Sequence, residues 1–206
     1  MKKTSIILIL LISLTLKGQT IIDINDSTYS NWSNNDYNYY KKDMHNLLDI
    51  FQGTYIYTNG NTSFKIILKK MIKQPEGLHY EDMIIGEYQY VENGTEKINT
   101  LSNLDISYSN QFLKHGIAGN GIIANIYNRL WKCPQCNPNE KRLILRIRDK
   151  STDRYANMIL RRTTIDNKEV LQVKINNING VTYDVEHESP PANFSLPIGE
   201  FTMKKL

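Results

Sequence analysis

The sequence predicts an all-β fold: an antiparallel sheet, closed as a barrel or folded as a sandwich, behind a short N-terminal amphipathic helix. Beyond residue 53, apolar and polar residues alternate over short runs, as expected of strands with one buried face. Turn-forming residues such as Asn93-Gly94 separate these runs. No helical repeats come between the runs, so parallel strands joined by crossover helices are not expected. A closed lipocalin-like barrel would also leave few exposed strand edges.

The first nineteen residues have the pattern of an export signal. Lys2 and Lys3 precede an apolar run over residues 6–16, and Lys17-Gly18-Gln19 follows it. Because no cysteine stands near the end of this segment, lipid attachment is not expected. No later apolar run approaches the roughly 20 residues of a membrane-spanning helix. We therefore expect residues 1–19 to be a signal peptide, and the mature chain to be soluble, without a transmembrane segment, and periplasmic, secreted or at the cell surface.

The charge of the chain argues against one class of function. Three of the 25 basic residues, but none of the 21 acidic residues, lie in the signal, which leaves the mature chain nearly neutral. A nucleic-acid-binding protein needs a clear excess of Lys and Arg to neutralise phosphates. Nucleic acid is therefore not an expected partner.

Residues 20–38 are rich in Asn, Ser and Asp and poor in apolar side chains, which predicts a disordered leader ahead of a single barrel domain over residues 39–206. A helical spacing of apolar residues opens that domain and predicts a short helix that ends at Gly53. The residues on its apolar face are Tyr40, Met44, Leu47, Leu48 and Phe51.

Two hairpins are predicted after this helix. The first joins strands over residues 54–58 and 63–70 through Asn59-Gly60-Asn61, and the second joins strands over residues 83–91 and 96–100 through Asn93-Gly94. Residues 101–120 show no clear period and are expected to be irregular. Further strands are predicted over residues 121–127, 142–149, 157–163, 169–175, 181–185 and 200–204.

The stretch over residues 44–64, MHNLLDIFQGTYIYTNGNTSF, resembles the opening of an uncharacterised family of exported proteins of the Bacteroidota, which carry a domain of unknown function. The resemblance continues through residues 86–90, 98–104, the cysteine pair at 133–136 and residues 199–202, so it covers nearly all of the mature chain. It implies a shared fold but no activity.

A more distant resemblance is to the lipocalin (calycin) barrels. In that family a short helix closes one end of the barrel, and a Gly-x-Trp on the first strand packs beneath it; here Phe51-Gln52-Gly53-Thr54-Tyr55 is similar to this element, with Tyr55 in place of the Trp. No Arg on the last predicted strand matches the family's partner residue, and Lys204 and Lys205 are the nearest candidates. Gly53 would let the backbone approach closely while an aromatic ring seals the barrel floor.

Cys133-Pro134-Gln135-Cys136 contains both cysteines of the chain, and three interpretations are open. A redox-active pair would stand at the start of a helix, but a loop with Asn137-Pro138-Asn139 and then a strand follow this motif. Zinc needs four ligands, and this motif supplies two. In an oxidising compartment, a local disulfide between Cys133 and Cys136 is the favoured interpretation.

Arg142, Arg146 and Arg148 share one face of the predicted strand over residues 142–149, opposite three apolar residues. Such a cationic face is a candidate site for a carboxylate, sulfate or phosphate group. The same pattern is also typical of the solvent-facing side of a sheet, where acidic residues balance the arginines.

Tyrosines alternate on two predicted strands, Tyr55 with Tyr57 and Tyr88 with Tyr90. Aromatic rows of this kind can line a pocket for a sugar or an apolar molecule. They are equally typical of ordinary packing, because cross-strand aromatic pairs stabilise a sheet without any ligand. The four tyrosines are therefore the candidate ligand-binding residues.

No recognisable catalytic set is present. The sequence lacks a nucleophile-elbow motif, a zinc-protease motif and a phosphate-binding glycine loop, and the acidic and histidine residues at 184–188 lack the spacing of a calcium loop. We expect no enzymatic activity, no cofactor and no metal. The leading hypothesis is an exported barrel that binds a small apolar or glycan ligand. The alternative is a structural or interaction protein that contacts another protein of the cell envelope.

Overall fold

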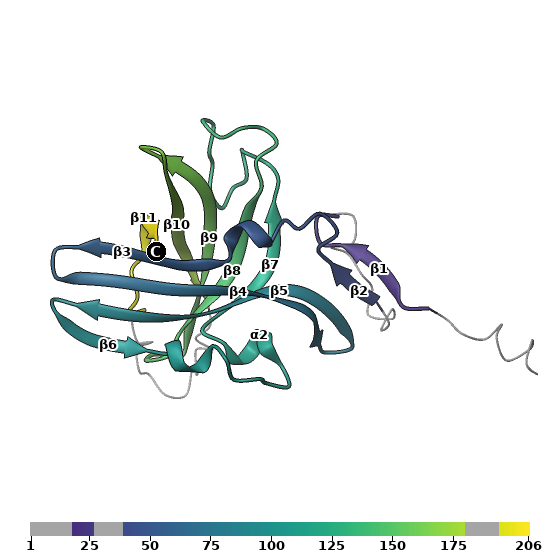
Figure 1. Ribbon diagram of the computed structural model, residues 1–206, viewed down its shortest axis with the longest axis horizontal. Coiled ribbons are helices and arrows are strands. Elements are labelled where there is room, and N and C mark those ends of the chain that lie inside the picture. The colour runs from purple at the N-terminus through teal and green to yellow at the C-terminus, as the bar shows by residue number, and fades with distance from the viewer. Residues whose placement is uncertain (1–17, 27–38, 180–193) are drawn as a thin grey trace, which may run out of the picture.

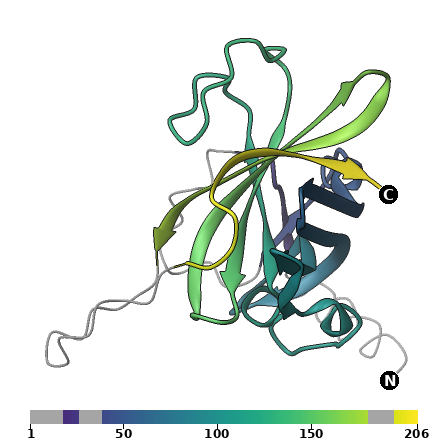
Figure 2. The same cartoon turned by 90° about the vertical axis from the view of Figure 1, so that its left-hand side faces the viewer.

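The computed structural model describes residues 18–26, 39–179 and 194–206, and for residues 177–179 the backbone alone (Figures 1 and 2). These residues form an almost wholly β structure, with one short α-helix, α2 (Gln111–Lys114), and two 3-10 turns, η2 (Asp49–Phe51) and η3 (Leu101–Asn103). The strands are β1 (Thr20–Asp23), β2 (Tyr39–Lys42), β3 (Gly53–Asn59), β4 (Thr62–Glu76), β5 (His79–Glu92), β6 (Thr95–Asn99), β7 (Ile117–Ile123), β8 (Arg142–Asp149), β9 (Arg154–Ile165), β10 (Lys168–Asn179) and β11 (Gly199–Lys205).

Eight of the described strands close into an antiparallel barrel, in the order β5-β4-β3-β11-β10-β9-β8-β7. The ring closes where β7 returns to β5, through the three pairs Ile84 with Gly119, Ile85 with Ala118 and Gly86 with Ile117. The predicted all-β fold is confirmed, and of the two predicted architectures the structure is the barrel. β6 and the parallel pair β1–β2 attach to β5 outside this ring.

The inward-facing side chains of the barrel form one hydrophobic core, which includes Tyr55, Phe64 and Tyr88. Residues ahead of two strands complete the core: Leu48 and Phe51 precede β3, and Phe194 and Leu196 precede β11. Because β3 and β11 are antiparallel neighbours, their starts lie at opposite ends of the barrel. The core is therefore covered by apolar side chains at both ends.

The helix predicted ahead of Gly53 is wrong, but two residues of its predicted apolar face do cover one end of the barrel core. Residues 39–42 are the extended strand β2, which pairs with β1 and with the first part of β5, and only η2 is helical. The Asp43 carboxylate accepts hydrogen bonds from the amides of Leu47 and Leu48, which replaces a helical ladder at this point. Met44 is consequently 56% exposed, whereas Leu48 and Phe51 are buried.

The segment predicted as a disordered leader contains a strand. β1 pairs in parallel with β2, and Ile22 and Ile24 are buried. The few apolar residues of this segment therefore pack at the edge of the sheet. Residues 27–38 of the leader and residues 1–17 of the predicted signal lie outside the described residues, as does the strand predicted over residues 181–185.

Turn chemistry is the most accurate part of the sequence prediction. Asn93 and Gly94 both have positive φ, as a type I′ turn requires, and Asp166 and Asn167 form the same kind of turn between β9 and β10. The strands predicted over residues 63–70 and 83–91 are longer than expected, and as β4 and β5 they pair with each other in a hairpin that turns at Gly77. A bulge after Met71 interrupts this extension, and there Lys73 takes a positive φ.

The region over residues 101–127 differs most from the predicted strands. Residues 101–116 contain η3 and α2, while β7 begins at Ile117 and ends at Ile123 rather than spanning residues 121–127. The strand starts earlier because its first residues close the barrel against β5. After Ile123 the chain leaves the sheet and forms a long loop that ends at β8, whose bounds are those predicted.

Candidate functional site

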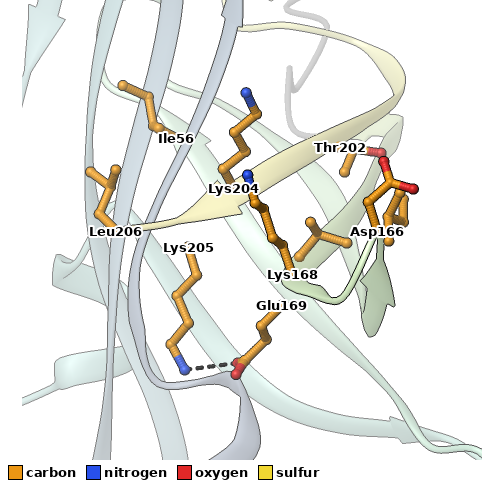
Figure 3. Close-up of a pocket in the computed structure, with 10 residues that line it drawn as sticks. Ile56, Asp166, Lys168, Glu169, Thr202, Lys204, Lys205 and Leu206 are labelled. Atoms are coloured by element: carbon orange, nitrogen blue, oxygen red, sulfur yellow. Dashed lines mark hydrogen bonds and ion pairs between the residues drawn. The ribbon is translucent and has the colours of Figure 1, made fainter.

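A groove of about 830 Å³ on the outer wall of the barrel is the candidate site, and we call it the outer groove (Figure 3). Strands β3, β10 and β11 and the β9–β10 turn contribute its walls. Apolar and charged side chains share the lining. The residues are Ile56, Ile165, Asp166, Lys168, Glu169, Val170, Thr202, Lys204, Lys205 and Leu206.

Cross-strand register brings the centre of the outer groove together. Ile56 on β3 lies opposite Lys204 on β11, and Lys204 lies opposite Val170 on β10. One strand neighbour of each of these residues belongs to the core: Tyr55 beside Ile56, Leu171 beside Val170 and Met203 beside Lys204. Because side chains alternate along a strand, Ile56, Val170 and Lys204 face outward.

The β9–β10 turn supplies a second wall of the outer groove. Asp166 and Asn167 hold the two positive φ angles that reverse the chain, and Lys168 begins the return strand. The hairpin projects beyond its neighbours in the barrel (Figure 2). Lys168 and Ile165 pair with each other at the end of this hairpin, beyond the outermost β10–β11 pair of Val170 with Lys204, and both line the outer groove.

An ion-pair cluster fixes one end of the outer groove. The Glu169 carboxylate lies 2.7 Å from Lys205 Nζ (Figure 3) and 2.9 Å from Arg162 Nε. The hydrogen bonds from Arg162 and then from Lys205 lower the pKa of Glu169 to about 2. Burial, together with the nearby Glu169 charge, raises the pKa of Tyr55 to about 12. Glu169 is therefore ionised and already neutralised by its neighbours.

Two lysines of the outer groove have no such partner. Within the part of the chain that the structure describes, neither Lys168 nor Lys204 forms an ion pair or a side-chain hydrogen bond. Lys204 and Lys205 leave β11 in opposite directions in Figure 3, so only Lys205 reaches Glu169. Two free ammonium groups beside apolar side chains suit the binding of an anionic, partly apolar ligand.

The four candidate tyrosines contact protein rather than an open pocket. Tyr55 and Tyr88 are 0% exposed, and the Tyr88 hydroxyl donates to the Arg148 carbonyl at 2.8 Å. Tyr90 packs edge-on against Phe64, and Tyr57 packs against Phe201 with 4.9 Å between ring centroids. Ligand binding by these residues stays a prediction.

The three candidate arginines face outward, as their spacing predicts, and each already has protein partners. Arg142 is buried and donates to the carbonyls of Trp131 and Asn125. Arg146 lies between two aromatic rings, with its guanidinium carbon 4.1 Å from the Phe112 centroid and 4.6 Å from the Tyr155 centroid. Arg148 pairs with Asp153. The structure thus gives these arginines roles in holding loops, and anion binding by them stays a prediction.

The cysteine pair forms a local disulfide in the loop between β7 and β8, with 5.3 Å between the two Cα atoms. Both cysteines are buried. Trp131, two residues before Cys133, packs against Ile159 on the outer face of β9. The Arg142 guanidinium lies over the Trp131 ring. The disulfide therefore shapes a loop that covers the outer wall.

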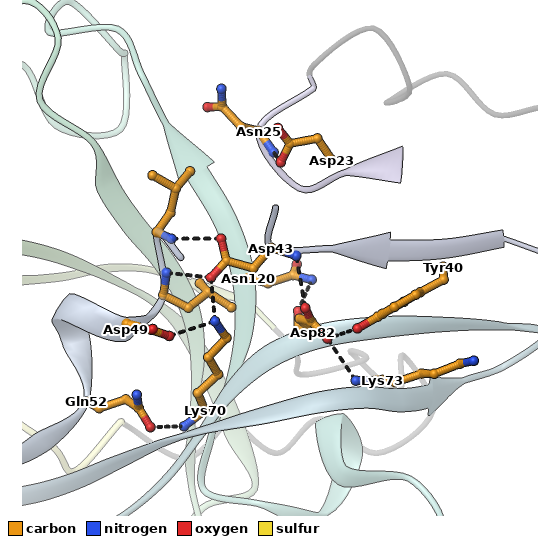
Figure 4. A network of polar contacts seen from close by, with 12 residues as sticks. Asp23, Asn25, Tyr40, Asp43, Asp49, Gln52, Lys70, Lys73, Asp82 and Asn120 are labelled. Carbon is orange, nitrogen blue, oxygen red and sulfur yellow. Dashed lines mark hydrogen bonds and ion pairs between the residues drawn. The ribbon is translucent and has the colours of Figure 1, made fainter. Parts of the chain in front are cut away.

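A buried polar network attaches the N-terminal segment to the barrel (Figure 4). Asp82 accepts hydrogen bonds from the Tyr40 hydroxyl at 2.5 Å and from the amides of Asp43 and Lys73 at 2.9 and 2.8 Å. Burial alone would raise the pKa of Asp43, but hydrogen bonds from Lys70 and from two backbone amides lower it below its usual value. This network explains how the unusual φ of Lys73 is maintained.

A second buried polar cluster, Glu87 with Gln111 and His115, was not anticipated from the sequence, in which His115 stands alone. His115 Nδ1 lies 2.9 Å from Glu87 Oε1, and His115 Nε2 lies 2.7 Å from Gln111 Oε1. Both ring nitrogens therefore have a hydrogen-bonding partner inside the barrel wall, and their donor and acceptor roles depend on the tautomer of the ring. Gly116 is the one residue whose type reflects this cluster in the sequence, because a Cβ at that position would lie only 2.9 Å from Glu87 Oε2.

Two further properties of the described residues bear on function. They contain no group of three or more His, Cys, Asp or Glu side chains placed to hold a metal ion. No helix among them has the length and apolar character needed to cross a membrane. The acidic and histidine residues at 184–188 lie outside the described residues.

Comparison with known proteins gives a family. The match is to the Family of unknown function (DUF6705), and it extends over residues 1–206, the full sequence. The chain belongs to this family. Neither a curated protein nor a solved structure matches the DUF6705 chain. The expected domain of unknown function is thus confirmed, whereas the Bacteroidota and lipocalin resemblances stay predictions.

Proposed function

We propose that this DUF6705 chain is an exported, non-enzymatic barrel that acts by binding a partner protein of the cell envelope on its outer wall. The observation that carries the proposal is the filled interior: Tyr55, Phe64 and Tyr88 are fully buried in one core with side chains from the other barrel strands. A small ligand inside the barrel would have to displace these rings. The outer groove has the outward-facing Ile56, Val170 and Lys204 at its centre, and a smaller pocket lies beside Trp131 of the β7–β8 loop and Thr202 of β11.

Two observations support export. The first nineteen residues have the charged start and apolar centre of a signal peptide. The Cys133–Cys136 disulfide is a bond that persists in oxidising compartments and is rare in the cytosol. A non-catalytic role agrees with the polar clusters, because Asp43, Asp82 and Glu87 are each buried and engaged by neighbouring backbone or side chains.

Site-specific photo-cross-linking in cells that produce the full chain tests the proposal. A photoreactive residue replaces Thr202, which is exposed in the outer groove, or Lys97, which is exposed on β6 across the barrel. We expect one protein adduct from position 202 and none from position 97. Native mass spectrometry of the protein from the same cells should give the mass of the unliganded chain. A stoichiometric small molecule in that spectrum, or no adduct from position 202, would contradict the proposal.

A further inference from the structure

We infer that the outer groove binds an acidic peptide segment of the partner, one in which an apolar side chain stands between Asp or Glu residues. The inference rests on the proposed function and names the chemistry that the outer wall recognises. Three features of the groove carry it: two uncompensated cations, an apolar centre, and a size and charge that suit a few peptide residues.

The unpaired lysines of the groove require a ligand with negative charge. Glu169 is ionised, but Arg162 and Lys205 already occupy its oxygens. Lys168 and Lys204 have no side-chain partner within residues 18–26, 39–179 and 194–206. Lys65 extends the cationic surface, because it lies opposite Ile56 on β4 and has no such partner there either. Among the side-chain carboxylates of the lining, Asp166 at the turn is the one that Arg162 and Lys205 do not engage.

The apolar centre sets the second requirement. Ile56 lies between Lys65 and Lys204 in the cross-strand register, and Val170 lies on the far side of Lys204. Ile165 and Leu206 add apolar surface at the rim and are 42% and 70% exposed. An apolar side chain of a ligand would remove this surface from water while acidic neighbours reach the lysines.

Size and charge favour a short peptide over a larger polyanion or a membrane. The volume of about 830 Å³ accommodates a few residues. Nucleic acids and anionic bilayers require a longer row of cations, and Asp166 and Glu169 interrupt the cationic surface here. In a segment with two or more carboxylates around one or two apolar side chains, the carboxylates match the two free lysines and the apolar side chains match the apolar lining.

Fluorescence anisotropy with the dye-labelled peptide Asp-Glu-Leu-Phe-Asp-Glu tests the inference. The variant K168E/K204E reverses the two free charges of the groove. The variant K42E/K132E makes the same change in net charge at two exposed lysines outside the groove, on β2 and in the β7–β8 loop. We expect K168E/K204E to weaken binding at least about tenfold and K42E/K132E to change it less than about twofold at roughly 50 mM salt.

A second probe with Ser-Ser in place of Leu-Phe separates apolar contact from charge, and it should bind at least about tenfold more weakly than the first. The melting temperatures of both variants establish that they are folded. The inference is overturned if the wild-type chain does not bind the first probe, if both variants lose binding equally, or if the Ser-Ser probe binds as well. Dodecanoate binding that depends on Lys168 and Lys204, without peptide binding, would overturn it in favour of an amphiphile.

The same variants separate this inference from the proposed function. If the adduct from position 202 persists in K168E/K204E, the partner still binds the outer wall without the groove lysines. The proposed function then stands and the acidic-peptide inference fails. If the adduct is absent from the wild-type chain, the proposed function fails regardless of how the peptide behaves.

Discussion

Lys70 and Asp43 form an ion pair with 2.8 Å between Nζ and Oδ2, in which the Asp43 side chain is fully buried and the Lys70 side chain is 11% exposed. The same carboxylate accepts the amides of Leu47 and Leu48. One buried charge therefore connects strand β4 to the segment that covers one end of the core. Lys70 also reaches Asp49, at the start of η2.

Replacing Lys70 by Met should destabilise the protein by about 3 kcal/mol, because it leaves the Asp43 charge buried without its partner. Urea unfolding of the two proteins measures the difference. The matched control is Lys69→Met, which removes the exposed pair with Asp105 and should cost less than about 1 kcal/mol. Equal losses from the two substitutions would show that the burial of Asp43 does not determine the effect.

The ion-pair cluster at Glu169 should make stability depend on acidic pH. The pKa of Glu169 is about 2 in the folded protein, below the ordinary value of 4.5. A carboxyl with a lowered folded-state pKa contributes its stabilisation above the unfolded pKa, and this contribution is lost as pH falls from about 4.5 toward 2. Carbon NMR of the Glu169 carboxyl should show the low midpoint, and Lys205→Met should raise it. A midpoint near 4.5 would contradict this assignment.

Gly86 lies at the seam where β7 closes the barrel, and a Cβ there would lie 2.7 Å from the Ile67 carbonyl oxygen. Gly86→Ala should therefore force the neighbouring strand to move, at a cost of about 1–3 kcal/mol. Gly94→Asn is the control, because Gly94 has open space around it and Asn tolerates its positive φ. Thermal unfolding distinguishes them, and an unchanged melting temperature for Gly86→Ala would show that the seam relaxes freely.

The buried pair of Glu87 and His115 should be strongly coupled. His115→Leu leaves the buried Glu87 carboxyl without its imidazole hydrogen-bond partner, which should cost about 1–3 kcal/mol. Adding Glu87→Gln to this variant replaces the unpaired carboxyl by a neutral amide and should recover part of the loss. Urea unfolding of the single and double variants gives the coupling energy. Additive losses would mean that the two side chains do not stabilise each other.

The disulfide should be structural rather than redox-active, because Cys133 and Cys136 are buried in a loop and not at the start of a helix. Its reduction potential should lie well below about −270 mV, the value typical of thioredoxin. Replacing both cysteines by Ser should cost about 2 kcal/mol, as expected for a short closed loop. Equilibration with a thiol buffer measures the potential, and a value above that of thioredoxin would favour redox chemistry.

Features that depend on neighbours in the sequence could be predicted well. The alternation over residues 142–149 gave the bounds of β8 and the outward face of Arg146, and Asn93-Gly94 gave a turn with two positive φ angles. Such patterns depend on only a few adjacent residues, because side-chain direction and turn geometry are local properties.

Features that depend on distant partners could not be predicted. The spacing from Tyr40 to Phe51 fits a helix, yet Tyr40 lies in a strand because the first part of β5 offers an unpaired edge, and Asp82 on β5 accepts its hydroxyl. The Glu87–His115 pair joins residues 28 positions apart. The outer groove likewise combines β3, β10 and β11, whose register the sequence alone does not reveal.

The pairing of Ile56 with Lys204 also constrains the order in which the protein can fold. Ile56 pairs with Lys204, and Tyr55 pairs with Lys205. These two pairs join β3, the first strand of the ring in the sequence, to β11, the last. The ring therefore stays incomplete until residues 199–205 are free to dock, and such distant contacts are slow to form. As the chain is synthesised from its N-terminus, the strands up to β10 therefore form at most an open sheet with exposed edges at β3 and β10. Closure of the barrel is a late step that waits for β11.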